Sequence, residues 1–187
     1  MDVCERFDKT IIEKFSLETI AKSYDSKYME YVSPQNTDNF DFVSKDMLAG
    51  LEVTTVIPCN EIEAHKYQIE LNKGKKNLSI KKILNGKIKE DDSLHSWYGG
   101  GMGEIKNKIL LTLQKKNNIA IRRLQQSKIK SVDLCICIVD GGLFDLSSFE
   151  IAFSNFNEYI FENIFFITRS YFIRYNKNVG FQEFVLK

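Results

Sequence analysis

The chain has 187 residues, of which 43% are hydrophobic, and its 26 Lys and Arg side chains nearly balance 25 Asp and Glu side chains. Its 14 Phe and 8 Tyr residues exclude an intrinsically disordered chain, because they supply ample apolar surface for a core. No apolar run is long enough to cross a bilayer, and the polar start at 1–6 lacks the apolar segment of a signal peptide. We therefore expect one domain over residues 1–187, without a membrane partner and located in the cytoplasm.

The first seventy residues predict a helix, a β-hairpin and a second helix. Apolar residues at helical spacing indicate a helix over 5–24. Two short β-rich runs at 40–43 and 51–57 are typical of hairpin strands, since polar residues and a glycine separate them. A capping Asn after the second run then predicts a helix over about 61–71.

The second half predicts a helix over 104–126, a strand over 132–139, a helix over 147–161 and strands over 164–168 and 171–175. The glycine-rich residues 99–103 before the first of these helices are expected to form a loop. The largely apolar run at 132–139 is typical of a strand that is covered on both faces. This order of elements predicts an α/β domain with a mixed β-sheet flanked by helices.

The cysteines and histidines do not follow the spacing of a zinc site. No Cys-x-x-Cys pair occurs, and His65 and His95 stand alone. Cys135 and Cys137 alternate with isoleucines, so both thiols should point to one face of a strand. We expect them to be buried free thiols, as in proteins of a reducing compartment.

The charges are distributed unevenly along the chain. Residues 73–130 contain 15 basic and 4 acidic side chains, so the remainder of the chain is acidic. One interpretation is a set of solvated helix faces. The other is a basic surface that binds a polyanion, with DNA or RNA as the expected partner.

The predicted hairpin brings two carboxylates together. A symmetric hairpin centred between Asp46 and Met47 pairs Asp41 with Glu52. Directly opposed residues point to one face, with Cβ atoms about 5 Å apart, so the two charges repel unless a cation lies between them. Strand alternation places Thr54 on the same face as Glu52.

Two such carboxylates are hard oxygen ligands of the kind that Mg²⁺ or Mn²⁺ prefers. These cations can activate a water molecule and stabilise the charge of a phosphodiester during hydrolysis. The alternative is an ordinary hairpin that carries a solvated Asp and a solvated Glu.

The pattern of Asp41 followed by Leu51-Glu52-Val53-Thr54 resembles the PD-(D/E)xK nuclease superfamily, as does the order of helix, hairpin, crossover helix and buried strand. The resemblance implies a restriction-endonuclease-like core. It also implies a metal-dependent endonuclease, a hydrolase of phosphodiester bonds in nucleic acid. Mg²⁺ or Mn²⁺ would then be held by Asp41, Glu52 and the carbonyl of Val53.

Two positions depart from the superfamily motif. Phe40 stands where a proline precedes the aspartate, and Thr54 stands where the motif has its lysine. Some members supply that lysine from the crossover helix. Here, steps of three and four residues from Ile105 place Lys116 on or near the sheet-facing side of that helix. Lys116 could orient the attacking water or stabilise transition-state charge, or it could simply extend from an apolar face to solvent.

These patterns support two functional hypotheses. In the first, the chain is a metal-dependent nuclease whose basic stretch 73–130 follows the phosphate backbone, with catalytic residues Asp41, Glu52, Thr54 and Lys116. Glu13 is a further candidate acidic ligand, while Lys108 and Lys115 are expected to face solvent as phosphate contacts. In the second, the chain is a non-catalytic interaction or nucleic-acid-binding module on the same fold, with a vestigial acidic site.

Overall fold

A computed structural model describes residues 8–35, 39–57, 102–138, 146–147, 158–168 and 171–186, together with residues 150, 153 and 156. Its helices are α1 (Lys9–Ser23), the 3₁₀ helix η2 (Ser26–Glu30) and α4 (Met102–Gln126). Its strands are β1 (Phe42–Val43), β2 (Ala49–Val56), β3 (Ser131–Ile138), β4 (Asn163–Ile167), β5 (Phe172–Asn176) and β6 (Gly180–Phe184). They form one sheet in the order β1-β2-β3-β4-β5-β6, in which β2, β3 and β4 run parallel and the outer pairs are antiparallel. The predicted α/β class and mixed sheet are confirmed.

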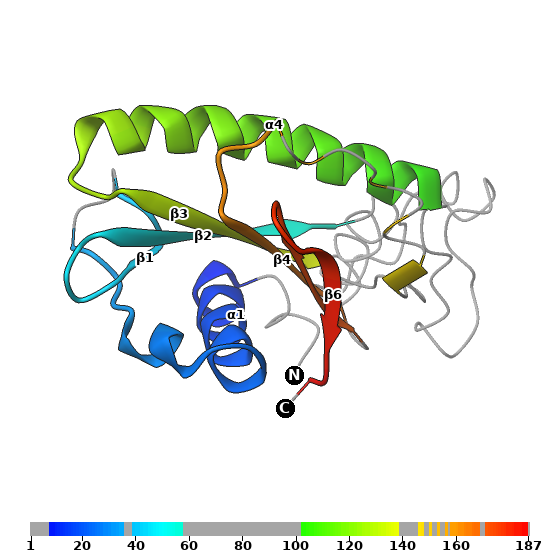
Figure 1. Ribbon diagram of the computed structural model, residues 1–187, viewed down its shortest axis with the longest axis horizontal. Helices are drawn as coiled ribbons and strands as arrows, with labels where there is room; N and C mark the ends of the chain where they lie inside the picture. Colours follow the sequence, from blue (N-terminus) through cyan, green and yellow to red (C-terminus); the bar gives the residue numbers. More distant parts are fainter. Residues whose placement is uncertain are drawn as a thin grey trace, which may run out of the picture.

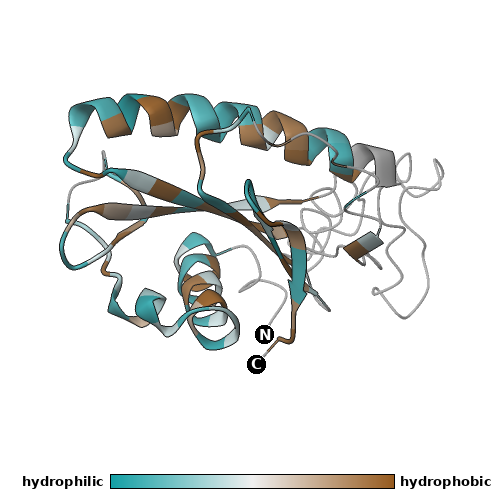
Figure 2. Cartoon of the chain, in the orientation of Figure 1, coloured by the Kyte–Doolittle hydropathy of each residue, from teal (hydrophilic) through white to brown (hydrophobic). Residues whose placement is uncertain are grey.

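Helices cover the two faces of this sheet, with α4 along one face and α1 against the other (Figure 1). On the α4 side, Ile109 and Leu113 pack with Leu134 of β3, and on the α1 side Ile20 packs with Leu51 of β2. Hydrophilic and hydrophobic residues alternate along α4, as expected of a helix with one buried side (Figure 2). Burial from both sides explains why β3 is apolar at every position except Ser131 and Asp133, and the prediction of a doubly covered strand is confirmed.

The hairpin register agrees with the sequence pattern. Phe42 pairs with Leu51 and Val43 pairs with Gly50, so the next position outward sets Asp41 opposite Glu52. Gly50 has a steric role here, because a Cβ atom at this position would lie 2.6 Å from the ring of Phe40.

Several elements differ from their predicted bounds. The helix expected over 147–161 is wrong in its second half, because residues 153 and 156 are not helical and residues 158–160 form a turn and bends. The Glu162 N–H then donates to the Val132 carbonyl. Residues 102 and 103 belong to α4 instead of the glycine-rich loop, and β6 follows Gly180 where no element was predicted. The helix predicted over 61–71 lies outside the described residues.

A buried polar network joins the α1 face of the sheet to η2. Asp133 of β3 is 6% exposed and accepts hydrogen bonds from the Tyr28 hydroxyl (2.6 Å), the Asn163 N–H (2.9 Å) and the Asn163 side-chain amide (2.9 Å). The Asn176 side-chain amide donates in turn to Asn163. Burial raises the pKa of the Asp133 carboxyl, and the bonds from Tyr28 and Asn163 oppose that rise. The apolar run of β3 concealed this residue from sequence analysis.

The raised pKa of Asp133 predicts a particular pH dependence of stability. Between the pKa of an unfolded Asp (about 3.9) and the higher folded value, the folded chain binds more protons. Wild type should therefore lose stability relative to Asp133→Asn as pH rises through that window, by up to about 1.4 kcal/mol per pH unit. Urea unfolding of both proteins across this range measures the drift.

Asp46 provides a control, because its pKa is lowered whereas that of Asp133 is raised. Hydrogen bonds from the Ser44 hydroxyl and the Leu48 N–H lower the pKa of Asp46. Wild type should therefore gain stability relative to Asp46→Asn as pH rises through the corresponding window. The raised pKa of Asp133 is contradicted if the stability of wild type relative to each variant changes with pH in the same direction for both variants. It is also contradicted if the comparison with Asp133→Asn shows no pH dependence.

Candidate functional site

Glu52 of β2 faces α4 and is almost fully buried, with 4% of its surface exposed. The Lys116 amine lies 2.5 Å from its Oε1, and Nη1 of Arg123 lies 2.6 Å from its Oε2. Both carboxylate oxygens therefore have a cationic partner from the same helix. Removing one partner from a buried ion pair is costly, because the remaining charge keeps its desolvation penalty.

The helical repeat explains why α4 supplies both cations. Lys116 and Arg123 are seven residues, or about two turns, apart, and both share the side of α4 that carries Ile105 and Ile109. The prediction that Lys116 lies on the sheet-facing side is confirmed. The Arg123 guanidinium also lies over the Phe40 ring, at 5.6 Å from its centroid. Arg123 was not predicted from the sequence, although its seven-residue spacing from Lys116 was a usable signal.

Asp41 lies at the outer edge of the sheet, directly before β1. Its Oδ2 accepts the Val53 N–H at 2.8 Å, so the side chain extends the hydrogen-bond ladder beyond the end of β1. The N–H and C=O of one strand residue point to the same side, so the Val53 carbonyl faces this edge as well. Asp41 Oδ1 lies 3.3 Å from the amine of Lys9 in α1.

Glu13 of α1 joins the Asp41 end of the site. Its Oε1 lies 3.0 Å from the same Lys9 amine, which therefore bridges two carboxylates. Burial raises the pKa of Glu13, and the nearby Asp41 charge adds to the rise, while Lys9 opposes it. Hydrogen bonding to Glu13 and the charge of Asp41 raise the pKa of Lys9. The structure thus places the predicted extra acidic residue beside Asp41.

The two carboxylates of the predicted pair are neutralised separately. Glu52 takes its partners from α4, whereas Asp41 bonds to Val53 at the sheet edge and to Lys9 of α1 on the opposite face. The cations required by the like charges are therefore supplied by the protein itself. Metal binding by Asp41, Glu52 and Val53 stays a prediction, as does a catalytic role of these residues.

The remaining predicted residues differ in their surroundings. Thr54 lies half-buried on β2, and alternation puts it on the Glu52 face. Lys115 is exposed, as expected. The prediction that Lys108 faces solvent is wrong, because the residue is half-buried and its amine donates to the Ile57 carbonyl at 2.5 Å. Of the basic stretch 73–130, residues 73–101 lie outside the described part.

Within the described part of the chain, no group of three or more His, Cys, Asp or Glu side chains is arranged to hold a metal ion. Cys135 and Cys137 are buried free thiols on the α1 face, as predicted. None of the described helices is both long enough and apolar enough to cross a membrane. Comparison with protein-family models, with curated proteins and with solved structures finds no match.

The buried ion pairs of Glu52 and the exposed ion pairs of Lys9 predict different losses in the free energy of unfolding on substitution. Glu52→Gln should lower the free energy of unfolding by about 3 kcal/mol, because two partly buried cations lose their counter-charge. Lys9→Gln should lower it by less than about 1 kcal/mol, since the Lys9 side chain is 77% exposed and its ion pairs are screened by water. Urea unfolding measures both, and equal costs contradict the structural role of Glu52.

Proposed function

We propose that this chain is a divalent-metal-dependent hydrolase of phosphodiester bonds in nucleic acid, with a restriction-endonuclease-like core. The observation that carries the proposal is the contact between the Lys116 amine and Glu52, next to Val53, whose N–H holds Asp41. A lysine from the crossover helix thus reaches the motif glutamate at the point where the motif lysine is missing. Such an enzyme, with its buried free thiols, belongs in the reducing cytoplasm.

The donor atoms at this edge suit a hard cation. The Asp41 and Glu13 carboxylates already share one cation, the Lys9 ammonium. Asp41, the Val53 carbonyl and Glu52 would hold Mg²⁺ or Mn²⁺, which supplies a bound water and neutralises phosphate charge. For this, the Glu52 carboxylate must turn away from Lys116 and Arg123. Lys116 then keeps its positive charge beside the reacting phosphate and stabilises the transition state.

The second candidate function is a non-catalytic nucleic-acid-binding module on the same fold. It is favoured by the engagement of both Glu52 oxygens with Lys116 and Arg123, an arrangement that secures α4 without any metal. In that case Asp41 is a structural residue that completes the ladder at Val53.

Asp41→Asn separates the two functions. An Asn side chain can still accept the Val53 N–H, but it loses the negative charge that a metal requires. For a nuclease, we expect Mg²⁺- or Mn²⁺-dependent cleavage of single- and double-stranded DNA and RNA to fall by about 100-fold or more, while the free energy of unfolding changes by less than about 1 kcal/mol. Full activity in Asp41→Asn contradicts the metal site. Wild type that binds nucleic acid without any metal-dependent cleavage supports the module.

Lys116 is tested by charge-conserving and charge-removing changes. Lys116→Gln should slow cleavage about 100-fold, Lys116→Arg should retain part of the activity, and Lys14→Gln on the exposed side of α1 should leave it unchanged. Thr54→Lys restores the superfamily motif and should raise activity. Circular dichroism and the free energy of unfolding show whether each variant folds. Equal activity of Lys116→Gln and wild type contradicts the role of Lys116.

A further inference from the structure

One flank of α4 carries a row of basic residues. Lys108, Lys115 and Arg122 recur every seven residues, or about two turns, so they lie along one side of the helix. The Lys108 amine reaches the Ile57 carbonyl at the end of β2. This contact places the row on the flank that overlooks β2 and the β1 edge.

The opposite flank of α4 packs against the rest of the domain. Leu110, Asn117 and Leu124 also recur every seven residues. Leu110 and Leu124 pack against the α4-side core, and Asn117 accepts the N–H of Ile160 at 2.7 Å, shortly before β4. The two flanks therefore face opposite edges of the sheet, and the basic row faces the edge that carries Asp41.

Two residues of this row, Lys115 and Arg122, carry positive charges that no residue of the described ranges neutralises. Lys115 and Arg122 are exposed and form no ion pair with any residue of the described ranges. Lys130, also exposed, continues the charge beside the hairpin, because its N–H donates to the Leu48 carbonyl. The sole acidic residue of α4, Glu104, stands in its first turn. A surface of this kind attracts a polyanion.

We propose that Lys115 and Arg122 of α4, together with Lys130 just before β3, form a basic ridge that binds the phosphates of a nucleic-acid strand running alongside α4 and past the β1–β2 edge. Lys115 and Arg122 are seven residues apart, which is about 10 Å along the helix axis. This separation corresponds to about three base pairs of duplex at 3.4 Å rise. The proposal rests on the proposed function for the choice of nucleic acid, and it names the surface that guides the strand to the site.

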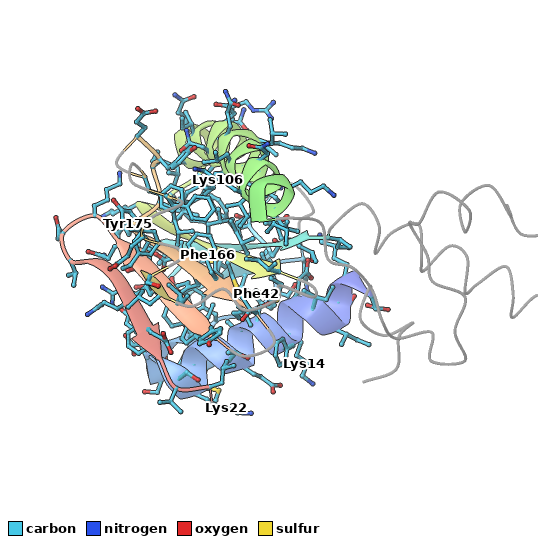
Figure 3. All side chains as sticks on the ribbon, turned by 90° about the vertical axis from the view of Figure 1, so that its right-hand side faces the viewer. Lys14, Lys22, Phe42, Lys106, Phe166 and Tyr175 are labelled. Carbon is cyan, nitrogen blue, oxygen red and sulfur yellow. The ribbon has the colours of Figure 1, made fainter. Side chains whose placement is uncertain are left out.

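The test compares one ridge double variant with a charge-matched control and a single-charge control in the full chain. The ridge double variant Lys115→Gln/Arg122→Gln is set against Lys14→Gln/Lys22→Gln, which removes the same charge from α1 across the sheet (Figure 3). A second control, Lys106→Gln, removes a charge from the packed flank of α4, since Lys106 lies four residues before Leu110. Anisotropy of a labelled DNA duplex and a labelled single strand, measured with a chelator present, reports binding in the absence of metal-dependent cleavage.

We expect the ridge double variant to bind about tenfold more weakly at low salt. The slope of log K against log salt should fall by about 1.8 for duplex, or about 1.4 for single strand, because two phosphate contacts are lost. Both controls should bind as wild type does.

Three results contradict the binding of nucleic acid by the ridge. They are wild-type affinity in the ridge double variant, an equal loss in the α1 control, and wild type that binds only an acidic protein or anionic vesicles. In the first two, metal-dependent cleavage that still requires Asp41 leaves the proposed function standing. In the third, the choice of nucleic acid fails together with the ridge.

Discussion

The position of α4 on the sheet depends on the buried charge of Glu52. A carboxylate at 4% exposure is tolerated in a strand only when its oxygens are paired, and here Lys116 and Arg123 pair one oxygen each. Because the two cations stand about two turns apart, their shared partner fixes the rotation of α4 about its axis. That rotation buries Ile109 and leaves Lys115 exposed, so the apolar core and the charged surface follow from one ion-pair cluster.

The residues next to the edge strand β1 pack against the same ion-pair cluster of Glu52, Lys116 and Arg123. Arg123 lies over the Phe40 ring, which occupies the space that a Cβ of Gly50 would need. Phe40 therefore packs on the α4 side, while the adjacent Asp41 reaches along the sheet edge to the Val53 N–H. This local geometry lets two opposed residues of a hairpin keep their negative charges, since each obtains a separate set of donors.

Local periodicity was sufficient to predict the hairpin register and the sheet-facing side of Lys116, because both depend only on spacing within one element. The partners of Glu52 lie 64 and 71 positions away, so the seven-residue spacing indicates that both cations share one side of α4 but not that they converge on Glu52. Asp133 was missed for a related reason: its neighbours in β3 are apolar, and its partners Tyr28 and Asn163 come from distant segments. Residues 158–161 depart from their helical prediction because the chain turns there toward β4, where the Glu162 N–H bonds to the Val132 carbonyl.

In the proposed enzyme, the Glu52 oxygens cannot pair with the cations of α4 and bind a metal ion at the same time. If the carboxylate turns to a divalent cation, Lys116 and Arg123 lose a partner at a point where they are 19% and 22% exposed. A phosphate of bound nucleic acid would supply the missing negative charge, since guanidinium and ammonium groups bind phosphate oxygens as readily as carboxylates. Metal and nucleic acid should then strengthen each other's binding, and linkage requires the effect to be reciprocal. The ion-pair cluster that holds the helix would thereby make metal binding at Glu52 depend on the presence of the substrate.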